Sequence, residues 1–261
     1  MTQDQKYAST IFFKAAIPLL KVIATDVPKL GNKLKGKNFV LQLSALDGED
    51  KYATHFVVTD GEFDVNFSVH EKPDIELEFP NMDHFVRFMA GKTMKLPRLK
   101  GMFKHFGIFV TVMMLLLKMA GLLQAKDLPK KEEDRVLLVK LYFFLLANGI
   151  SQLNKAGHPD VKNWALKSPD RVYAFAVNNY PEISAWIRVK AGNSKSGRGE
   201  YTRCKPFFQM RFDTIEHALD ILLQKADMIA YTAESKLIMD GAPEFGGQLG
   251  QFMMIIAGYA T

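Results

Sequence analysis

The feature that most constrains the fold is a repeat that runs through the whole chain of 261 residues. KPDIELEF begins at Lys72, and KPFFQMRF begins at Lys205, which lies 133 positions later. At the same offset His84 corresponds to His217. Further on, the second half gains seven residues near 226–239, and GIFVTVMMLL then corresponds to GQLGQFMMII. Each half has an ordinary domain size, so we predict a tandem repeat with domains at 1–127 and 128–261.

Both halves show the same order of hydrophobic patterns. Apolar and polar residues alternate at 75–79 and at 208–212, which predicts a strand in each half. A short helix with an acidic first turn is expected after each of them, at 83–92 and 216–225. Apolar helices are expected at 7–24 and 132–153, and further strands at 38–46, 55–58, 62–69, 172–177 and 186–189. The predicted fold class is therefore α+β, while GNSKSGRG at 192–199 is expected to be a flexible hairpin loop.

The composition restricts the class of protein and its partners. Hydrophobic residues make up 48% of the chain, as in globular proteins, and the net charge of +6 favours anionic partners. Cys204 is the only cysteine, so the chain can form no internal disulfide. The first ten residues lack the charged and apolar regions of a secretory signal, which makes a cytoplasmic location the expectation.

The stretch GIFVTVMMLLLKMAGLL at 107–123 is almost long enough to cross a bilayer. On a helix, Lys104, Thr111 and Lys118 would form a polar line, and the counterpart GQLGQFMMII is too polar to span. We therefore predict the closing helix of the first domain, with its opposite face buried. Whether that face fills the core or lines a ligand cavity stays open at this point. The face carries Met102, Phe106, Phe109, Met113, Leu116 and Ala120.

The pattern resembles the sterol carrier protein type 2 family. The residues that carry this resemblance are Asp60-Gly61 and the ranges 72–79, 83–92 and 101–123 in the first half, and 205–212, 216–225 and 236–256 in the second. The resemblance implies two tandem domains, each a mainly antiparallel sheet covered by helices, with an apolar tunnel between them. It also implies non-covalent binding and intracellular carriage of a sterol, fatty acid, acyl-CoA or similar lipid, without a cofactor. The family lacks a catalytic signature.

Two groups of candidate site residues follow. The first is expected to bind the hydrophobic ligand, partly through flexible methionines: Leu77, Phe88, Met102, Phe106, Phe109, Met113, Leu116, Leu117, Leu249, Met253 and Ile256. The second is a basic segment with interleaved apolar residues and no acid, expected to dock on an anionic membrane surface or head group: Lys92, Lys95, Arg98, Lys100 and Lys104. A solvated loop is the alternative for the second group.

Motifs for catalysis or metal binding were sought as well. The chain has no Gly-x-Ser-x-Gly elbow and no pair of histidines four residues apart. We predict no catalytic residue, no metal and no nucleic-acid partner, and we leave the oligomeric state open. The alternative function is an enzyme, or an accessory to one, that acts on an apolar substrate held in the same tunnel. A structural pair of domains without a ligand is a third hypothesis.

Overall fold

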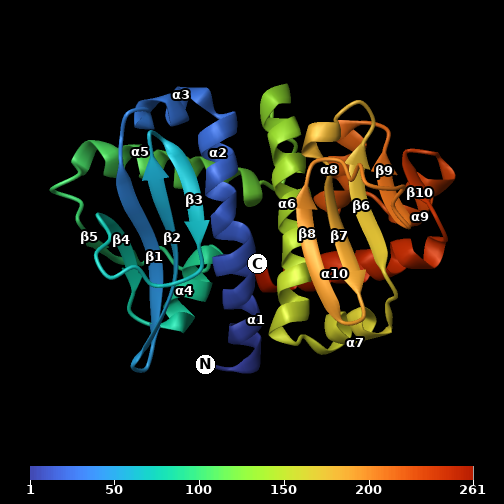
Figure 1. The fold of residues 1–261 in the computed structure, drawn as a ribbon. Helices are drawn as coiled ribbons and strands as arrows, with labels where there is room; N and C mark the ends of the chain where they lie inside the picture. Colours follow the sequence, from blue (N-terminus) through green and yellow to red (C-terminus); the bar gives the residue numbers. More distant parts are fainter. Residues whose placement is uncertain (261) are drawn as a thin grey trace. The chain divides into compact units, whose positions relative to one another are not determined.

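The computed structural model describes residues 1–260 as two compact units. The first unit is built from Met1–Gly121 together with Tyr259 and Ala260 at the end of the last helix, and the second is Leu122–Gly258. The mixed α+β class is confirmed, because each unit contains a five-stranded sheet and several helices (Figure 1). Whether the units are two copies of one sterol-carrier-like domain stays a prediction.

In the first unit the helical segments are α1 (Gln3–Ile11), η1 (Phe12–Ala16), η2 (Ile17–Leu19), α2 (Leu20–Asp26), α3 (Pro28–Gly31), η3 (Asn32–Leu34), α4 (Met82–Met89) and α5 (Phe106–Leu123). Its strands are β1 (Phe39–Asp47), β2 (Asp50–Thr59), β3 (Glu62–Asn66), β4 (Ile75–Phe79) and β5 (Arg98–Lys100). The strand order is β3-β2-β1-β4-β5, and only β1 and β4 run parallel.

In the second unit the helical segments are α6 (Glu132–Ala156), α7 (Pro159–Lys167), η4 (Pro181–Ile183), α8 (Ile215–Leu222), α9 (Met228–Ala233) and α10 (Pro243–Ala260). Its strands are β6 (Arg171–Val177), β7 (Ala185–Lys190), β8 (Asn193–Arg198), β9 (Phe208–Phe212) and β10 (Leu237–Asp240). The order β8-β7-β6-β9-β10, with β6 and β9 parallel, is the same topology as in the first sheet.

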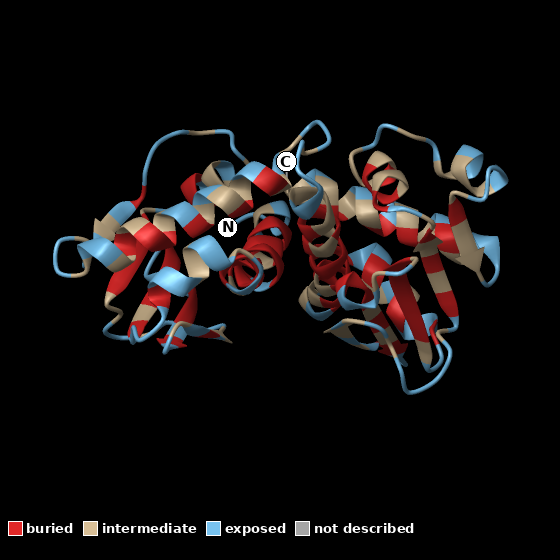
Figure 2. Ribbon diagram, turned by 90° about the horizontal axis from the view of Figure 1, so that it is seen from above, coloured by how far each residue is buried: buried red, intermediate tan, exposed pale blue. Residues whose placement is uncertain are grey.

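One face of each sheet is apolar and packs against helices. In the first unit Phe79 packs edge-on against Phe85 of α4, and Phe13 of η1 stacks on the same ring at 4.1 Å. In the second unit Phe143 of α6 stacks on Phe175 of β6 at 5.7 Å. Figure 2 shows that buried residues are concentrated along these helices and the strands beneath them. Large aromatic side chains therefore form both cores.

The first helix changes its hydrogen-bond pattern where it crosses the sheet. Segment η1 is π-helical, with hydrogen bonds from each N–H to the carbonyl five residues earlier, as from the Ile17 N–H to the Phe12 carbonyl. In that pattern the Phe13 carbonyl would accept from Pro18, which has no N–H. The Thr54 hydroxyl of β2 donates to it instead, at 2.7 Å. A strand side chain thus satisfies the buried carbonyl that the proline leaves open.

The expected loop at 192–199 is wrong, because Asn193–Arg198 forms strand β8. Ala191 and Gly192 both adopt positive φ, at 45° and 82°, and make a two-residue turn between β7 and β8. The small hydroxyl side chains of β8 then fit against α6, where Ser194 meets Ser151 at 3.1 Å. The glycine and serine residues of this segment therefore allow β8 to pack closely against α6.

Within residues 1–260, three helical segments are long and apolar enough to cross a membrane, judged by length and composition alone. In the segments Gln3–Asp26 and Glu132–Ala156, 78% and 72% of the most apolar window is buried inside the protein. In Phe106–Leu123, which is α5, the buried share is 33%. The most hydrophobic of the three segments is therefore the least covered.

Candidate functional site

Helix α5 buries a different face from the one predicted from the sequence. Its most buried row consists of Val112, Leu115, Met119 and Leu122, while Phe106 and Leu117 face solvent. The prediction that Thr111 lies on an exposed polar line is wrong. The Thr111 hydroxyl donates to the Gly107 carbonyl of its own helix at 3.1 Å, so it can be buried. A helix that is apolar on all sides carries no sequence signal for the face it buries.

The structure separates the residues predicted to line a ligand cavity into three groups. Leu77, Phe109, Leu249 and Ile256 are buried in the cores. Phe88, Met102, Met113, Leu116 and Met253 are half-buried. Phe106 and Leu117 are exposed, and the expectation that Phe106 lies on a buried face is wrong. The half-buried group therefore stays the candidate lining, while the exposed pair belongs to the surface.

The basic segment lies at the edge of the first sheet. Its strand β5 is the last in the strand order (Figure 1), and apolar residues precede and follow it in the sequence. Met94 before the strand and Phe103 after it are each 89% exposed. Lys92, Lys95 and Lys104 are exposed as well, and none of them forms an ion pair among residues 1–260. Apolar tips beside unpaired cations suit the interface of an anionic membrane.

Two contacts fix the backbone of this segment. The Nε2 of His84 donates to the Lys95 carbonyl at 2.6 Å, and the His84 ring packs edge-on against Phe79. Gly101 adopts a positive φ of 76°, and a Cβ built there would lie 1.8 Å from the Asp74 carbonyl oxygen. The segment is therefore anchored at its middle and at its end, with the side chains of Met94 and Phe103 directed outward.

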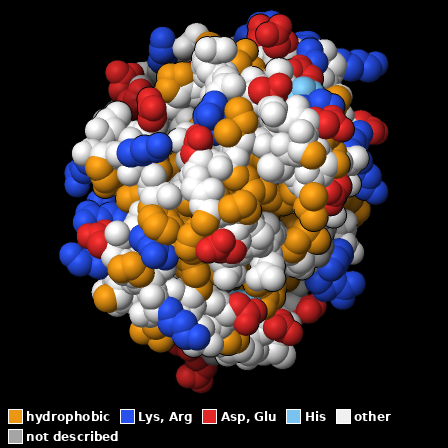
Figure 3. All heavy atoms as spheres, turned by 90° about the vertical axis from the view of Figure 1, so that its right-hand side faces the viewer, with side chains coloured by type: hydrophobic (Ala, Val, Ile, Leu, Met, Phe, Trp, Pro, Cys, Tyr) orange, Lys and Arg blue, Asp and Glu red, His pale blue; other side chains and the backbone are white. Residues whose placement is uncertain are grey.

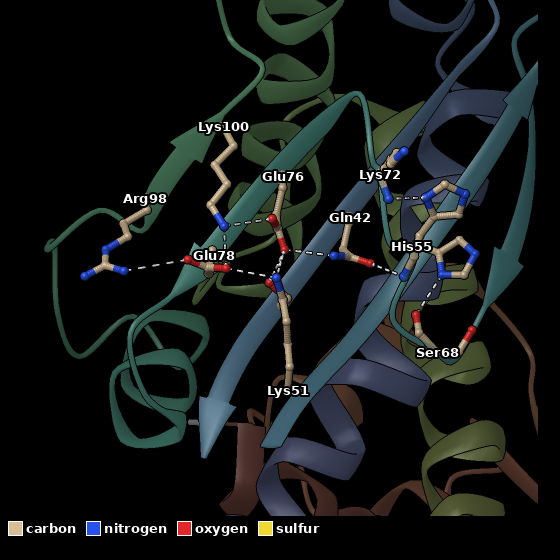
Figure 4. Close-up of polar contacts among 11 residues, drawn as sticks. Gln42, Lys51, His55, Ser68, Lys72, Glu76, Glu78, Arg98 and Lys100 are labelled. Carbon is tan, nitrogen blue, oxygen red and sulfur yellow. Dashed lines mark hydrogen bonds and ion pairs between the residues drawn. The ribbon is translucent and has the colours of Figure 1, made fainter. Parts of the chain in front are cut away.

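Arg98 and Lys100 take part in an ion-pair network, unlike the other three cations of the basic segment (Figure 4). Lys100 contacts Glu78 at 2.6 Å and Glu76 at 3.2 Å, and Arg98 lies 3.8 Å from Glu78. Lys51 of β2 completes the cluster at 2.5 Å from Glu76. Sequence reasoning placed these two cations in the docking group because it could not foresee that β5 would pair with β4.

This charge network covers the open face of the first sheet. Burial alone would raise the pKa of Glu76, but hydrogen bonds from Lys51, Ser44 and Gln42 outweigh it and lower the pKa to about 2. The pKa of Glu78 is also lowered, where the opposing burial is overcome by hydrogen bonds from Lys100 and Lys51. Both carboxylates are therefore ionised at neutral pH, which suits a structural ion pair better than proton transfer.

An equivalent ion pair in the second sheet has its charges exchanged. Lys100 and Asp240 occupy the same register, because they pair with Glu76 in β4 and with Gln209 in β9. In the second sheet, Asp240 on the edge strand accepts a hydrogen bond from Arg211 at 3.0 Å. In the first sheet, Lys100 at the equivalent edge position donates to Glu78. The carboxylate lies on the inner strand of the first sheet and on the edge strand of the second.

The second unit also presents apolar side chains to solvent. Figure 3 shows hydrophobic atoms gathered on one of its faces, with charged groups around them. Ile229 of α9 and Met254 of α10 are exposed. Between these helices, a Cβ added to Gly250 would lie 3.3 Å from the sulfur of Met228, so the glycine makes room for that methionine.

His84 and His217, which correspond in the repeat, have different partners. His84 holds the basic segment, whereas the His217 Nδ1 lies 2.5 Å from the Asp213 carboxylate. The His217 ring also packs edge-on against Tyr231 at 5.4 Å. No group of three His, Cys, Asp or Glu side chains among the described residues is arranged to hold a metal ion.

Comparisons with known proteins place the chain far from characterised sequences. No family model and no curated protein matches it. A solved structure of a conserved hypothetical protein from Thermus thermophilus, described as a candidate sterol carrier protein, matches at 15% identity with a TM-score of 0.31. The match covers 52% of this chain and 93% of that one. The inverting sec-alkylsulfatase Pisa1 from Pseudomonas sp. matches at 12% identity with a TM-score of 0.26, over 66% of this chain and 30% of the sulfatase.

Proposed function

We propose that the chain binds a sterol, fatty acid, acyl-CoA or similar lipid non-covalently, and that its first unit docks on an anionic membrane surface to exchange this ligand. The observation that carries the proposal is the surface around β5 and α5. There, Met94, Leu96 and Phe103 are each at least 65% exposed, on the same segment as three unpaired lysines. A cytoplasmic location stays a prediction.

The energy available from this surface is sufficient for reversible docking. Burying a Met, Phe or Leu side chain stabilises by roughly 1.5–3 kcal/mol. Each lysine close to an anionic surface adds about 1 kcal/mol. Three apolar tips and three cations together are comparable with the cost of losing translational freedom. We therefore expect salt-sensitive binding that is lost on membranes without anionic lipid.

The ligand would lie against the half-buried face of α5, with the helix acting as a lid. An apolar helix that is only one-third buried can move without exposing a large additional core. Met113 and Met102 offer flexible thioether contacts to a chain of variable shape. Each CH₂ group that leaves water contributes about 0.8 kcal/mol.

Docking is tested by co-sedimentation with vesicles of phosphatidylcholine alone and of phosphatidylcholine with phosphatidylserine. Replacing Lys92, Lys95 and Lys104 by Gln should weaken binding to the anionic vesicles on the order of 100-fold, from three charges at about 1 kcal/mol each. The matched control replaces three exposed lysines before β1 that carry the same charge: Lys33, Lys35 and Lys37. Equal losses of binding in both triple variants would show that only the net charge matters, and would contradict a specific role for the basic segment.

The apolar part has its own pair of variants. Phe103→Ser should weaken vesicle binding, whereas Ile229→Ser, which alters another highly exposed apolar residue in the second unit, should leave it unchanged. Cargo binding is tested by native mass spectrometry of the purified protein with lipid extraction, and then by uptake of a fluorescent fatty acid and a fluorescent sterol. A protein that carries no lipid and takes up neither probe would refute the carrier function.

A further inference from the structure

The open face of the second sheet contains a cavity of about 210 Å³. Its floor is formed by Ala174 and Ala176 of β6 and by Gln209 and Arg211 of β9. These positions alternate along the strands with the aromatic residues that pack against the helices, such as Phe175, so the cavity lies on the opposite side of the sheet. It is thus separate from the lipid space proposed between sheet and helices.

The register of the two sheets explains how the second sheet gains this space. Gln42 pairs with Glu76 and Ser44 pairs with Glu78 in the first sheet. At the same places in the second sheet, Ala174 pairs with Gln209 and Ala176 pairs with Arg211. In the first sheet the Gln42 amide and the Ser44 hydroxyl fill the face and both donate to Glu76 (Figure 4). The two alanines remove those groups and leave their volume empty.

The floor of the cavity carries a fixed guanidinium group. Arg211 donates through Nε to Asp240 at 3.0 Å, through a terminal nitrogen to the same carboxylate at 3.5 Å, and through the other to Asn178 at 2.9 Å. A guanidinium has five N–H groups, so two remain. The side-chain amide of Gln209 beside it has no hydrogen-bond partner among residues 1–260. Donors held rigidly in this way are preorganised for an acceptor.

The walls combine apolar and polar side chains, Asn179 and Ser184 among the polar ones, and are held in place. Val177, Pro181 and Pro206 line the sides. The segment that closes the cavity is fixed by the Gly199 N–H, which donates to the Ser184 carbonyl at 2.7 Å. It is fixed further on by Tyr201, whose ring packs against Trp186 at 4.9 Å. Glu200 lies at the exposed rim.

We propose that this cavity binds a small monocarboxylic acid with a short apolar chain. The carboxylate would accept from the two remaining N–H groups of Arg211 and from the Gln209 amide, the geometry that guanidinium groups recognise best. The chain would lie over the two alanines. The volume corresponds to roughly seven water molecules, which admits a chain of a few carbons and is too small for a sterol.

The experiment uses the full-length ¹⁵N-labelled protein and three probes of equal length: sodium hexanoate, hexanamide and hexylammonium chloride. Hexanoate should give saturable shifts of the amide signals of Ala174, Ala176 and Tyr201, hexanamide weaker ones, and hexylammonium none. Shifts that do not saturate, or that are equal for the amine and the acid, would overturn the proposal.

Two variants distinguish this cavity from other binding. Ala174→Gln with Ala176→Ser installs the residues found in the first sheet, and should abolish the shifts while the indole signal of Trp164, which packs on Phe252, confirms folding. Glu200→Gln removes the negative charge at the rim and should tighten hexanoate binding. Hexanoate binding that survives in the double variant would place the acid elsewhere, for example in the proposed lipid space.

Discussion

Glu76→Gln should destabilise the first unit by an amount that depends on pH in a defined way. Glu76 is 4% exposed, and hydrogen bonds to its carboxylate hold its pKa at about 2, against an ordinary value of 4.5. This difference corresponds to about 3 kcal/mol of unfolding free energy at neutral pH. The amide has the shape of the protonated acid and cannot take part in this titration.

The sign of the effect follows from the lowered pKa. The stability that the Glu76 carboxylate contributes is fully present above pH 4.5, where it is ionised in both states, and is lost as the pH falls toward 2. The difference between wild type and variant should therefore shrink to about 1.5 kcal/mol at pH 3 and below about 0.5 kcal/mol at pH 2.

Urea unfolding measures this difference, and the positions of the tryptophans allow the two units to be followed separately. Trp164 and Trp186 both lie in the second unit, so their fluorescence follows that unit. The first unit is followed by far-UV circular dichroism and by hydrogen exchange of the Leu43 and Leu77 amides. Glu71→Gln, which removes the same charge from an exposed site, is the control. A variant that loses equal stability at pH 7 and pH 2, or none at pH 7, would refute the role given to the charge.

Substitutions at four further positions test the packing. Thr54→Val leaves the Phe13 carbonyl without a donor and should cost about 1–3 kcal/mol, which Thr54→Ser should largely restore; thermal unfolding decides. Gly101→Ala combines a positive φ with a clash against backbone and should lower the melting temperature and loosen the basic segment, read by limited proteolysis. Leu115→Ala should cost about 2–5 kcal/mol and Leu117→Ala almost nothing in urea unfolding, and the reverse order would contradict the observed orientation of α5.

The strands could be predicted where the sequence alternates. Ile75–Phe79 and Phe208–Phe212 form strands at the predicted residues, because one face is buried beneath helices and the other is polar. The repeat also predicted equivalent elements in both halves, and the two sheets have the same strand order. These features depend on local patterns that one strand or helix contains by itself.

The rest depends on partners that are distant in sequence. Helix α5 carries apolar residues on nearly all of its sides. Its sequence periodicity therefore does not decide which face is buried, and the shape of the sheet does. The strand β8 consists of residues that favour turns, and its pairing with β7 and its packing against α6 make it a strand. The cavity could be found only after the register showed that Ala174 and Ala176 replace Gln42 and Ser44.

The exchanged ion pair has a consequence for how the chain reaches its native state. Two sheets of one topology in one polypeptide could trade edge strands during folding. If β10 paired with β4, Asp240 would lie beside Glu78, and if β5 paired with β9, Lys100 would lie beside Arg211. Like charges on neighbouring strands repel, so each edge strand is accepted only by its own sheet.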